Sequence, residues 1–171
     1  MTSGLPGRES VDSLRLPMTP RQQLDVLIDR FTPEVAAIAR RALVKMRKLT
    51  PGSLELVYDN YNALAIGFSP TERAGDGIFS IALFPPHVSI FFLQGAKLPD
   101  PTRRFRGTGN VVRHIVLDDL VVFDAPDVRK LFELALARAK VKLDPKQRRK
   151  MIIKSISAKQ RPRRPKARPP R

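Results

Sequence analysis

The sequence predicts an α+β fold in which helices pack on one face of a sheet of about five mainly antiparallel strands. Stretches near residues 20–48 and 125–140 repeat apolar residues at three- and four-residue steps, which is typical of amphipathic helices. The stretch between them alternates apolar and polar residues with a period near two, which is typical of strands. Short connections between the alternating runs favour antiparallel neighbours, and helices covering one face of such a sheet give a two-layer domain.

Two helices open the predicted domain. Thr19-Pro20-Arg21-Gln22 supplies a capping hydroxyl, a first-turn proline and a glutamine three residues after the cap. We expect this helix to reach about Arg30. Thr32-Pro33-Glu34 repeats the same start signal, and the second helix is expected to end before Thr50-Pro51-Gly52.

The strands follow, and a third helix closes the domain. Strands are expected at residues 54–58, 64–68, 78–84, 87–93 and 111–117, which are rich in β-branched and aromatic residues. Pro85-Pro86 separates the third and fourth strands. The long connection at residues 94–110 is of a length that compact domains more often keep for function. Asp124 is expected to cap a helix that runs to about Lys140.

The charge of the chain is concentrated at its C-terminal end. The formal net charge is +16, and residues 141–171 hold thirteen of the 32 basic residues but one of the 16 acidic residues. We therefore predict a disordered leader at residues 1–18, the domain at residues 19–140 and a basic, largely disordered tail at residues 141–171. Within the tail, Asp144-Pro145 is a start signal for one more basic helix, which would contain Met151 and Ile156.

Such a tail predicts nonspecific contact with nucleic acid or another polyanion. The basic residues expected to make it are Arg148, Arg149, Lys150, Arg161, Arg163, Arg164, Lys166 and Arg168. A solubilising extension is the alternative interpretation.

Composition and missing motifs exclude several classes of function. The chain has no cysteine, which excludes disulfides, thiolate metal sites and thiol catalysis. No apolar run approaches the roughly 20 residues of a transmembrane helix, and no secretory signal pattern is present, so we expect a cytoplasmic protein. No nucleophile elbow or HExxH motif occurs, and we predict that the protein is not an enzyme.

An arginine- and glycine-rich stretch in the long connection is a candidate anion-binding site, because exposed backbone amides and guanidinium groups both bind anions. Its residues are Arg103, Arg104, Arg106, Gly107, Gly109 and Arg113. The alternative is that the glycines shape the start of a strand and the arginines are solvated. The stretch lacks the strand–GxGxxG–helix context of a dinucleotide site and the ending of a P-loop.

Two histidines and two aspartates are the candidate metal ligands. His87 and His114 lie at or within expected strands and would approach each other if those strands pair. A third ligand would come from an acid such as Asp100, Asp118 or Asp119. The alternative is that both histidines are half-buried and satisfied by hydrogen bonds.

Three motifs in the second half of the domain support a family resemblance. They are HVSIFF at residues 87–92, GAKLPDP at residues 95–101, and RGTGN at residues 106–110 leading into Arg113-His114-Ile115. In this order and spacing the chain resembles the YdhG-like domain family over residues 20–140. The resemblance implies a compact domain of mostly unassigned activity, some members of which are described as frataxin-like intracellular iron chaperones. We expect no cofactor, with iron as the alternative that the resemblance implies. The resemblance supplies no catalytic residues.

Two functions are consistent with these observations. The first is a binding or carrier module in which a pocket between the sheet and the long connection holds a small anion or a metal-bearing ligand. The second is a nucleic-acid-associated protein that binds through its tail, with Arg103, Arg104, Arg106 and Arg113 extending the contact.

Overall fold

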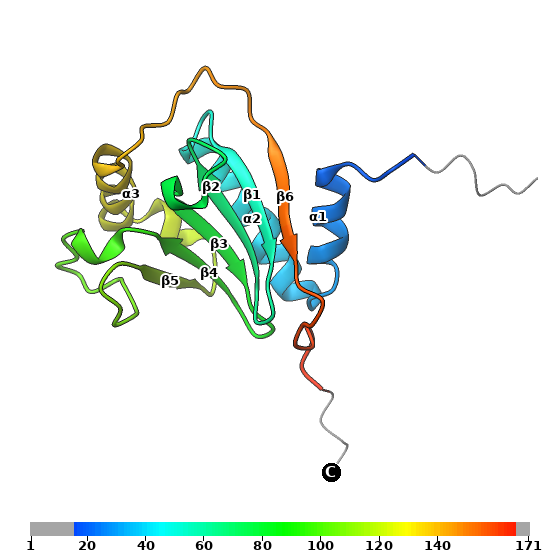
Figure 1. Ribbon diagram of the computed structural model, residues 1–171. Helices are drawn as coiled ribbons and strands as arrows, with labels where there is room; N and C mark the ends of the chain where they lie inside the picture. The colour runs from blue at the N-terminus through cyan, green and yellow to red at the C-terminus, as the bar shows by residue number, and fades with distance from the viewer. Residues whose placement is uncertain (1–15, 167–171) are drawn as a thin grey trace, which may run out of the picture.

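The computed structural model describes residues 16–166, and its elements follow the predicted order with one strand added at the end (Figure 1). The helices are α1 (Pro20–Ile28), α2 (Pro33–Leu49) and α3 (Pro126–Arg138). The strands are β1 (Leu54–Asp59), β2 (Leu64–Ser69), β3 (Phe79–Leu83), β4 (Val88–Phe92), β5 (Arg113–Leu117) and β6 (Met151–Ile156). Short 3-10 turns are η2 (Ala74–Asp76), η3 (Gly95–Lys97) and η4 (Val121–Asp124). The predicted α+β class is confirmed.

The first two helices begin where the capping signals place them. The Thr19 side chain accepts a hydrogen bond from the Gln22 amide and the Gln22 side chain accepts one from the Thr19 amide, which completes a capping box. At α2 the Thr32 side chain accepts one hydrogen bond, from the amide of Val35. At the other end of α2 the Thr50 hydroxyl donates to the Met46 carbonyl oxygen.

The predicted cap of the last helix is wrong. Helix α3 begins at Pro126 after Ala125, with no side-chain cap, and Asp124 instead ends the 3-10 turn η4. The proline at the first helical position fixes this start because it needs no partner for a backbone N–H. The Asp124 carboxylate is used elsewhere, in ion pairs with Lys45 and Arg129.

The strands form one sheet in the order β5-β4-β3-β2-β1-β6. Neighbours from β1 to β5 are antiparallel, as predicted, and a tight turn at Pro85-Pro86 joins β3 to β4 through hydrogen bonds between Phe84 and His87. The sixth strand is parallel to β1.

This sixth strand corrects the prediction of a disordered tail containing a basic helix. Residues 54–57 of β1 are buried on both faces of the sheet, so the edge of β1 needs a partner strand. β6 supplies it, with Met151 opposite Glu55 and Ile153 opposite Val57 (Figure 1). The apolar run at residues 151–153 therefore pairs as a strand, because two of its side chains pack against the core. Residues 1–15 of the predicted leader lie outside the described residues.

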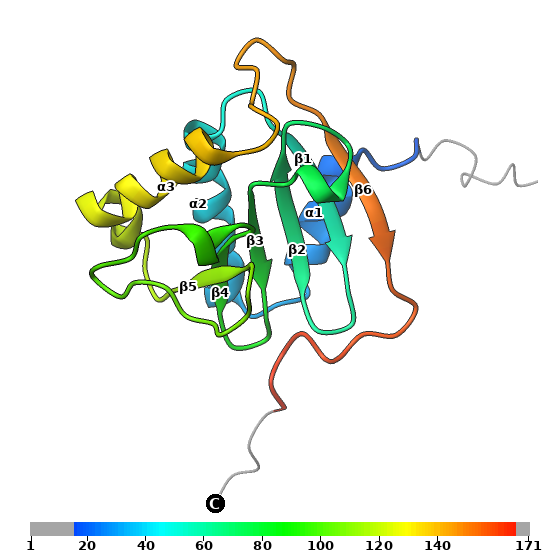
Figure 2. The ribbon, with the colours of Figure 1, turned by 60° about the vertical axis from the view of Figure 1, so that its left-hand side comes forward.

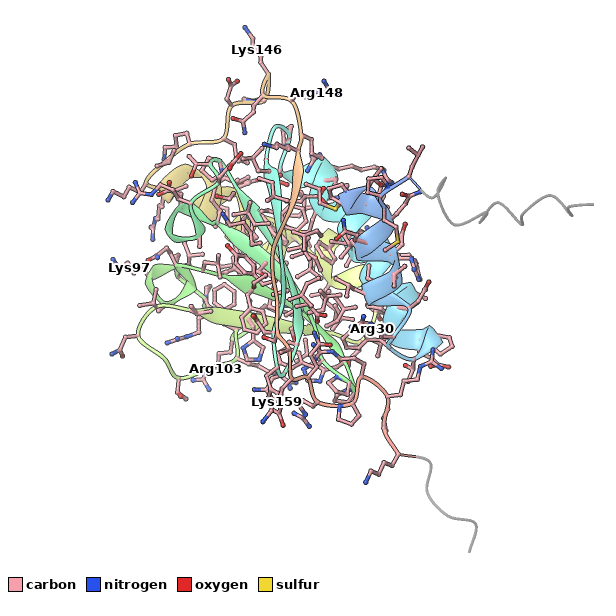
Figure 3. The ribbon with its side chains drawn as sticks, turned by 45° about the vertical axis from the view of Figure 1, so that its right-hand side comes forward. Arg30, Lys97, Arg103, Lys146, Arg148 and Lys159 are labelled. Carbon is pink, nitrogen blue, oxygen red and sulfur yellow. The ribbon has the colours of Figure 1, made fainter. Side chains whose placement is uncertain are left out.

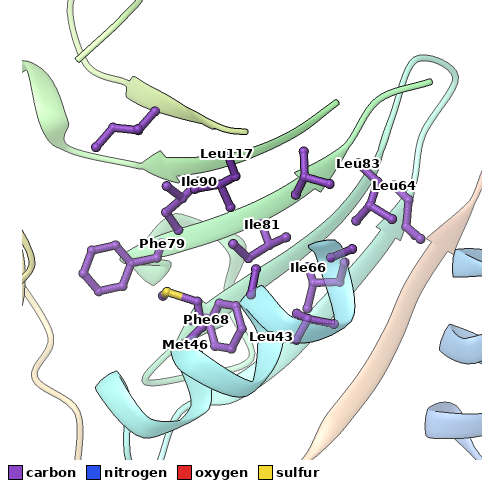
Figure 4. Close-up of a cluster of buried hydrophobic side chains, with 14 of the residues drawn as sticks. Leu43, Met46, Leu64, Ile66, Phe68, Phe79, Ile81, Leu83, Ile90 and Leu117 are labelled. Atoms are coloured by element: carbon purple, nitrogen blue, oxygen red, sulfur yellow. The ribbon is translucent and has the colours of Figure 1, made fainter. Parts of the chain in front are cut away.

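The core lies between the helices and one face of the sheet. Leu43 and Met46 of α2 meet Ile66, Phe68 and Ile81 of the sheet, and all five are buried (Figure 4). Helix α3 joins the same core through Phe132, whose ring lies 5.2 Å from Phe79 and 5.0 Å from Phe92. In Figure 2, turned by 60° from Figure 1, strands β1 to β3 stand in front of α1 and α2, so no helix lies over the face of the sheet that is turned toward the viewer. No helix in residues 16–166 is long and apolar enough to span a membrane.

Two buried acids of β1 attach the C-terminal segment to the domain. Glu55 is paired with Arg47 of α2 through two hydrogen bonds of 2.7 and 2.9 Å, and with Arg149 at 3.4 Å. The Arg149 guanidinium also donates to the carbonyl oxygens of Arg47 and Thr50 at the end of α2. Asp59 accepts hydrogen bonds from Arg163 at 2.7 Å and from Gln160 at 2.5 Å.

The C-terminal segment contacts the helical layer and the first turn as well. Arg164 donates to three carbonyl oxygens at the end of α1, at Asp29, Arg30 and Phe31. Gly52 lies so close to the segment that a Cβ there would be 1.8 Å from the Asp144 carbonyl oxygen, and its φ of +79° also favours glycine. The domain therefore continues beyond residue 140 to at least Arg164.

We predict that Arg163→Ala lowers the free energy of unfolding by about 3 kcal/mol, because it leaves a buried carboxylate without its main partner. The side chains of Arg163 and Asp59 are 4% and 2% exposed. Arg30 and Gln160 still contact Asp59 in the variant, which limits the loss. Arg161→Ala is the matched control, since that side chain is exposed, and should change stability by less than about 0.5 kcal/mol. Urea unfolding of both variants measures the difference, and equal midpoints would contradict the assignment.

Candidate functional site

The structure brings three of the predicted anion-binding arginines together, but with acids beside them. Arg103, Arg104 and Arg106 line a cavity of about 320 Å³ that Asp118 and Asp119 also line. Arg104 is committed to Asp127 through contacts of 2.5 and 3.1 Å. The hydrogen bond from Arg104, together with one from Thr102, lowers the pKa of the Asp127 carboxyl to about 2. The charges of this cavity are therefore nearly balanced.

The remaining residues of that predicted site shape the loop. The Asp100 carboxylate accepts hydrogen bonds from the amides of Arg104 and Phe105, and this tight turn holds Arg103 at a φ of 54°. Gly107 has a φ of +106°, which disfavours any other residue. Arg113 donates to the carbonyl oxygens of Gly109 and Val112.

The predicted metal ligands are not gathered into one site. His87 stacks on Phe84 and His114 stacks on Phe91, with ring centroids 5.0 Å apart in both pairs. The two phenylalanine rings lie between the imidazoles, 6.4 Å from each other. Within residues 16–166 no three His, Asp or Glu side chains are placed to hold a metal ion. The two histidines do share one face of the sheet, but as members of an aromatic chain.

Burial and neighbouring charge lower the pKa of His114 from its ordinary value. Desolvation is the largest cause that lowers the pKa of His114, and Arg106 and then His87 add Coulombic repulsion of the protonated form. Arg106 is close because its backbone forms an antiparallel bridge with His114, with N–O distances of 2.8 and 3.1 Å.

We predict that Arg106→Gln raises the pKa of His114, because it removes one of the cations that disfavour the imidazolium. NMR titration of the imidazole carbon and nitrogen shifts measures the change. Arg21→Gln on α1 is the control and should leave the titration unchanged. The desolvation remains in the Arg106 variant, so the pKa should stay below its usual value of about 6.5. An unchanged or lower pKa in the Arg106 variant would contradict the assignment.

The basic residues predicted to bind polyanions divide into two groups. Arg149, Arg163 and Arg164 hold the C-terminal segment on the domain, and Lys150 pairs with Glu72 at 3.0 Å. Arg148, Arg161 and Lys166 are exposed, and Figure 3 shows Arg148 projecting away from the sheet beside Lys146. Arg168 lies outside the described residues. Half of the predicted polycation is therefore structural.

A cavity that sequence reasoning did not assign to particular residues lies between the sheet end, the long connection and α3. Its volume is about 310 Å³. Ile78, Phe92, Leu98 and Ala135 give it an apolar lining. Lys97 of η3 contributes a cation from the connection that follows β4, and Figure 3 shows it well separated from Arg103 on the same connection.

The end of α3 supplies two further cations to this cavity. Arg138 and Lys140 both line it. One guanidinium nitrogen of Arg138 donates to the Lys97 carbonyl oxygen at 2.8 Å, which connects α3 to the long connection. The other N–H groups of the guanidinium take no part in this hydrogen bond. The one acid in the lining is Asp76, and its carboxylate accepts a hydrogen bond of 2.7 Å from Thr71.

The sequence did carry a signal for this cavity. The length of the connection at residues 94–110 is typical of functional loops, and basic residues cluster at the end of α3. What the sequence did not indicate is that the end of α3 lies beside residues 94–98, because that contact joins segments about 40 positions apart.

A wider groove of about 670 Å³ separates α2 from α3. The ion pair between Lys45 and Asp124, at 2.8 Å, joins its two walls. Its rim mixes both signs, since Glu133 stands beside the cations Arg41, Lys48 and Arg129.

No protein-family model, curated protein or solved structure matches this chain significantly. The resemblance to the YdhG-like family therefore stays a prediction from the residues.

Proposed function

We propose that the protein is a non-enzymatic binding module that holds a small, partly apolar anion in the cavity between the sheet end, η3 and α3. One observation carries the proposal: three cations, Lys97, Arg138 and Lys140, surround an apolar lining whose one carboxylate is already hydrogen-bonded. Small-ligand sites commonly combine an apolar lining with a few polar groups that fix orientation.

The balance of charge favours this cavity over the arginine cluster at Arg103. The cluster sets three guanidiniums against Asp118 and Asp119, and one of the three is already paired with Asp127. The cavity sets three cations against Asp76 alone. An anion entering the cavity gains charge-assisted hydrogen bonds without displacing an existing ion pair.

The lining indicates the class of ligand. A volume of about 310 Å³ is at the lower end of the range for small-molecule sites, roughly 300–1,000 Å³. Phe92 and Leu98 favour an aromatic or short aliphatic body, and the lysines and Arg138 favour a carboxylate, sulfonate or phosphate head. The ligand class is therefore an organic monoanion with an apolar body.

We predict that 1-naphthoate binds this cavity and that Lys97→Gln combined with Lys140→Gln weakens its binding about tenfold, because two of the three cations are lost. Isothermal titration calorimetry measures the affinity, and NMR shifts at the Ala135 methyl report the location. Lys146→Gln is the matched control, an exposed lysine that lines none of the three cavities described above, and should leave the affinity unchanged.

A steric pair of variants tests the location independently of charge. A Cβ at Gly75 or at Gly109 meets nothing within 4 Å, so both positions accept a large side chain, but only Gly75 lines the cavity. Gly75→Trp should reduce naphthoate binding, and Gly109→Trp should not. If the neutral analogue 1-naphthalenemethanol binds as tightly as naphthoate, or if both tryptophan variants behave alike, the proposal is wrong.

A further inference from the structure

The sheet face that carries no helix has an unusual distribution of side chains. Alternation along the strands directs Ala65 and Gly67 of β2, Ser80 and Ala82 of β3, and Ser89 of β4 to this face, opposite the core residues Ile66, Ile81 and Ile90. These five residues are small, so the centre of the face is a low shelf. A Cβ at Gly67 would make only ordinary contacts, the nearest at 3.6 Å, and Ala65, Gly67 and Ser80 are half-buried while Ala82 and Ser89 are buried.

A chain of four aromatic rings stands beside this shelf. His87 stacks on Phe84, Phe84 contacts Phe91, and Phe91 stacks on His114. Interplanar angles of 23° and 26° make both imidazole contacts nearly parallel. All four residues are half-buried, so part of each ring is in contact with solvent. Phe84 and Phe91 are not part of the hydrophobic core, which lies on the other side of the sheet.

Among the described residues, exposed cations without ion pairs lie beside β5, which carries His114, and after β6 at the opposite edge of the sheet. Arg106 lies directly opposite His114 in the backbone bridge, is exposed and has no ion-pair partner within residues 16–166. Arg103 is exposed on the same loop. Lys159 and Arg161 lie in the segment after β6, where the Arg161 amide donates to the carbonyl oxygen of Tyr61. Figure 3 shows Lys159 and Arg103 near the same end of the molecule.

The acids near this face are few. Asp118 and Asp119 follow β5, and the Asp119 carboxylate accepts a hydrogen bond from the Val121 amide. The lowered pKa of His114 favours its uncharged form, which suits an imidazole that stacks on another ring. The face thus combines partly exposed rings with the exposed cation Arg106, unpaired within residues 16–166, in a chain whose formal net charge is +16.

We propose that this face binds single-stranded nucleic acid, with unpaired bases stacking against the chain formed by Phe84, Phe91 and the two histidines. Phosphates would be held by Arg106 and by the cations near Lys159. Single strands fit because their bases are free to stack on aromatic side chains, whereas the bases of a duplex are buried in its own stack. The surplus positive charge supplies the electrostatic attraction. This site differs from the anion cavity at η3 and does not depend on it.

The test is fluorescence anisotropy of the full chain with a labelled 15-nucleotide RNA of mixed sequence, measured across a salt series. The same measurement is made with the equivalent single-stranded DNA and with the matching duplex. Unlabelled heparin serves as the competitor. Phe91→Leu keeps an apolar side chain but removes the ring, and should weaken single-strand binding about tenfold. Phe105→Leu is the matched control: this half-buried ring packs on the core side against Phe92, so affinity should not change. Circular dichroism and thermal melting verify that both variants fold.

The charge arm of the test uses Arg106→Gln against Arg21→Gln. Loss of one phosphate contact should reduce the slope of log affinity against log salt by about 0.7 for a single strand, and the α1 variant should leave the slope unchanged. The proposal is overturned if no binding occurs. It is also overturned if duplex and heparin bind as tightly as the single strand while Phe91→Leu has no effect, because that pattern is polyanion attraction alone.

Discussion

The pairing of two buried carboxylates with arginines from distant segments is the constraint on which the rest of the structure depends. Glu55 and Asp59 sit on β1, at 1% exposure each, and such charges are tolerated inside a protein only when they are paired. Their partners come from α2, through Arg47, and from the C-terminal segment, through Arg149 and Arg163. Because these ion pairs lie at both ends of β1, they hold the C-terminal segment alongside β1. The part of the segment between the two ion pairs forms β6, which completes the sheet.

This arrangement separates two surfaces with different chemistry. All three helices pack on one side of the sheet, and the contact between Arg138 and the Lys97 carbonyl oxygen closes a cationic cavity where α3 meets the long connection. The other side is left to small residues and a chain of aromatic rings. Several arginines of the C-terminal segment are used in ion pairs and hydrogen bonds that hold the fold together. Anions are therefore attracted by the cations that remain unpaired, and not by a free polycationic tail.

Local signals predicted the fold well, and long-range contacts were what they missed. The helix caps at Thr19 and Thr32 and the strand periodicity of β1 to β4 depend only on residues within four positions of each other. Both can therefore be predicted from the sequence alone. β6 was missed because Asp144-Pro145 resembles a helix start and the arginines around Met151 resemble a solvated tail. Only pairing with β1, nearly 100 positions away, shows that Arg149 and Arg163 neutralise buried acids. The anion cavity also could not be predicted from the sequence, because it combines two distant segments. The stacking of His114 on Phe91 depends only on the pairing of β4 with β5.

The most direct test of this account is amide hydrogen exchange, measured by NMR, at the two ends of the β1–β6 pairing. The Glu55 amide donates to the Lys150 carbonyl oxygen and the Ser157 amide to the Asp59 carbonyl oxygen, so these two hydrogen bonds mark the two ends of the β1–β6 pairing. If the C-terminal segment is an integral strand, both amides should be protected to nearly the same degree as those of β2 and β3. Exchange of the Ser157 amide at the rate of an unstructured peptide would contradict the account and return the basic segment to the role of a free tail.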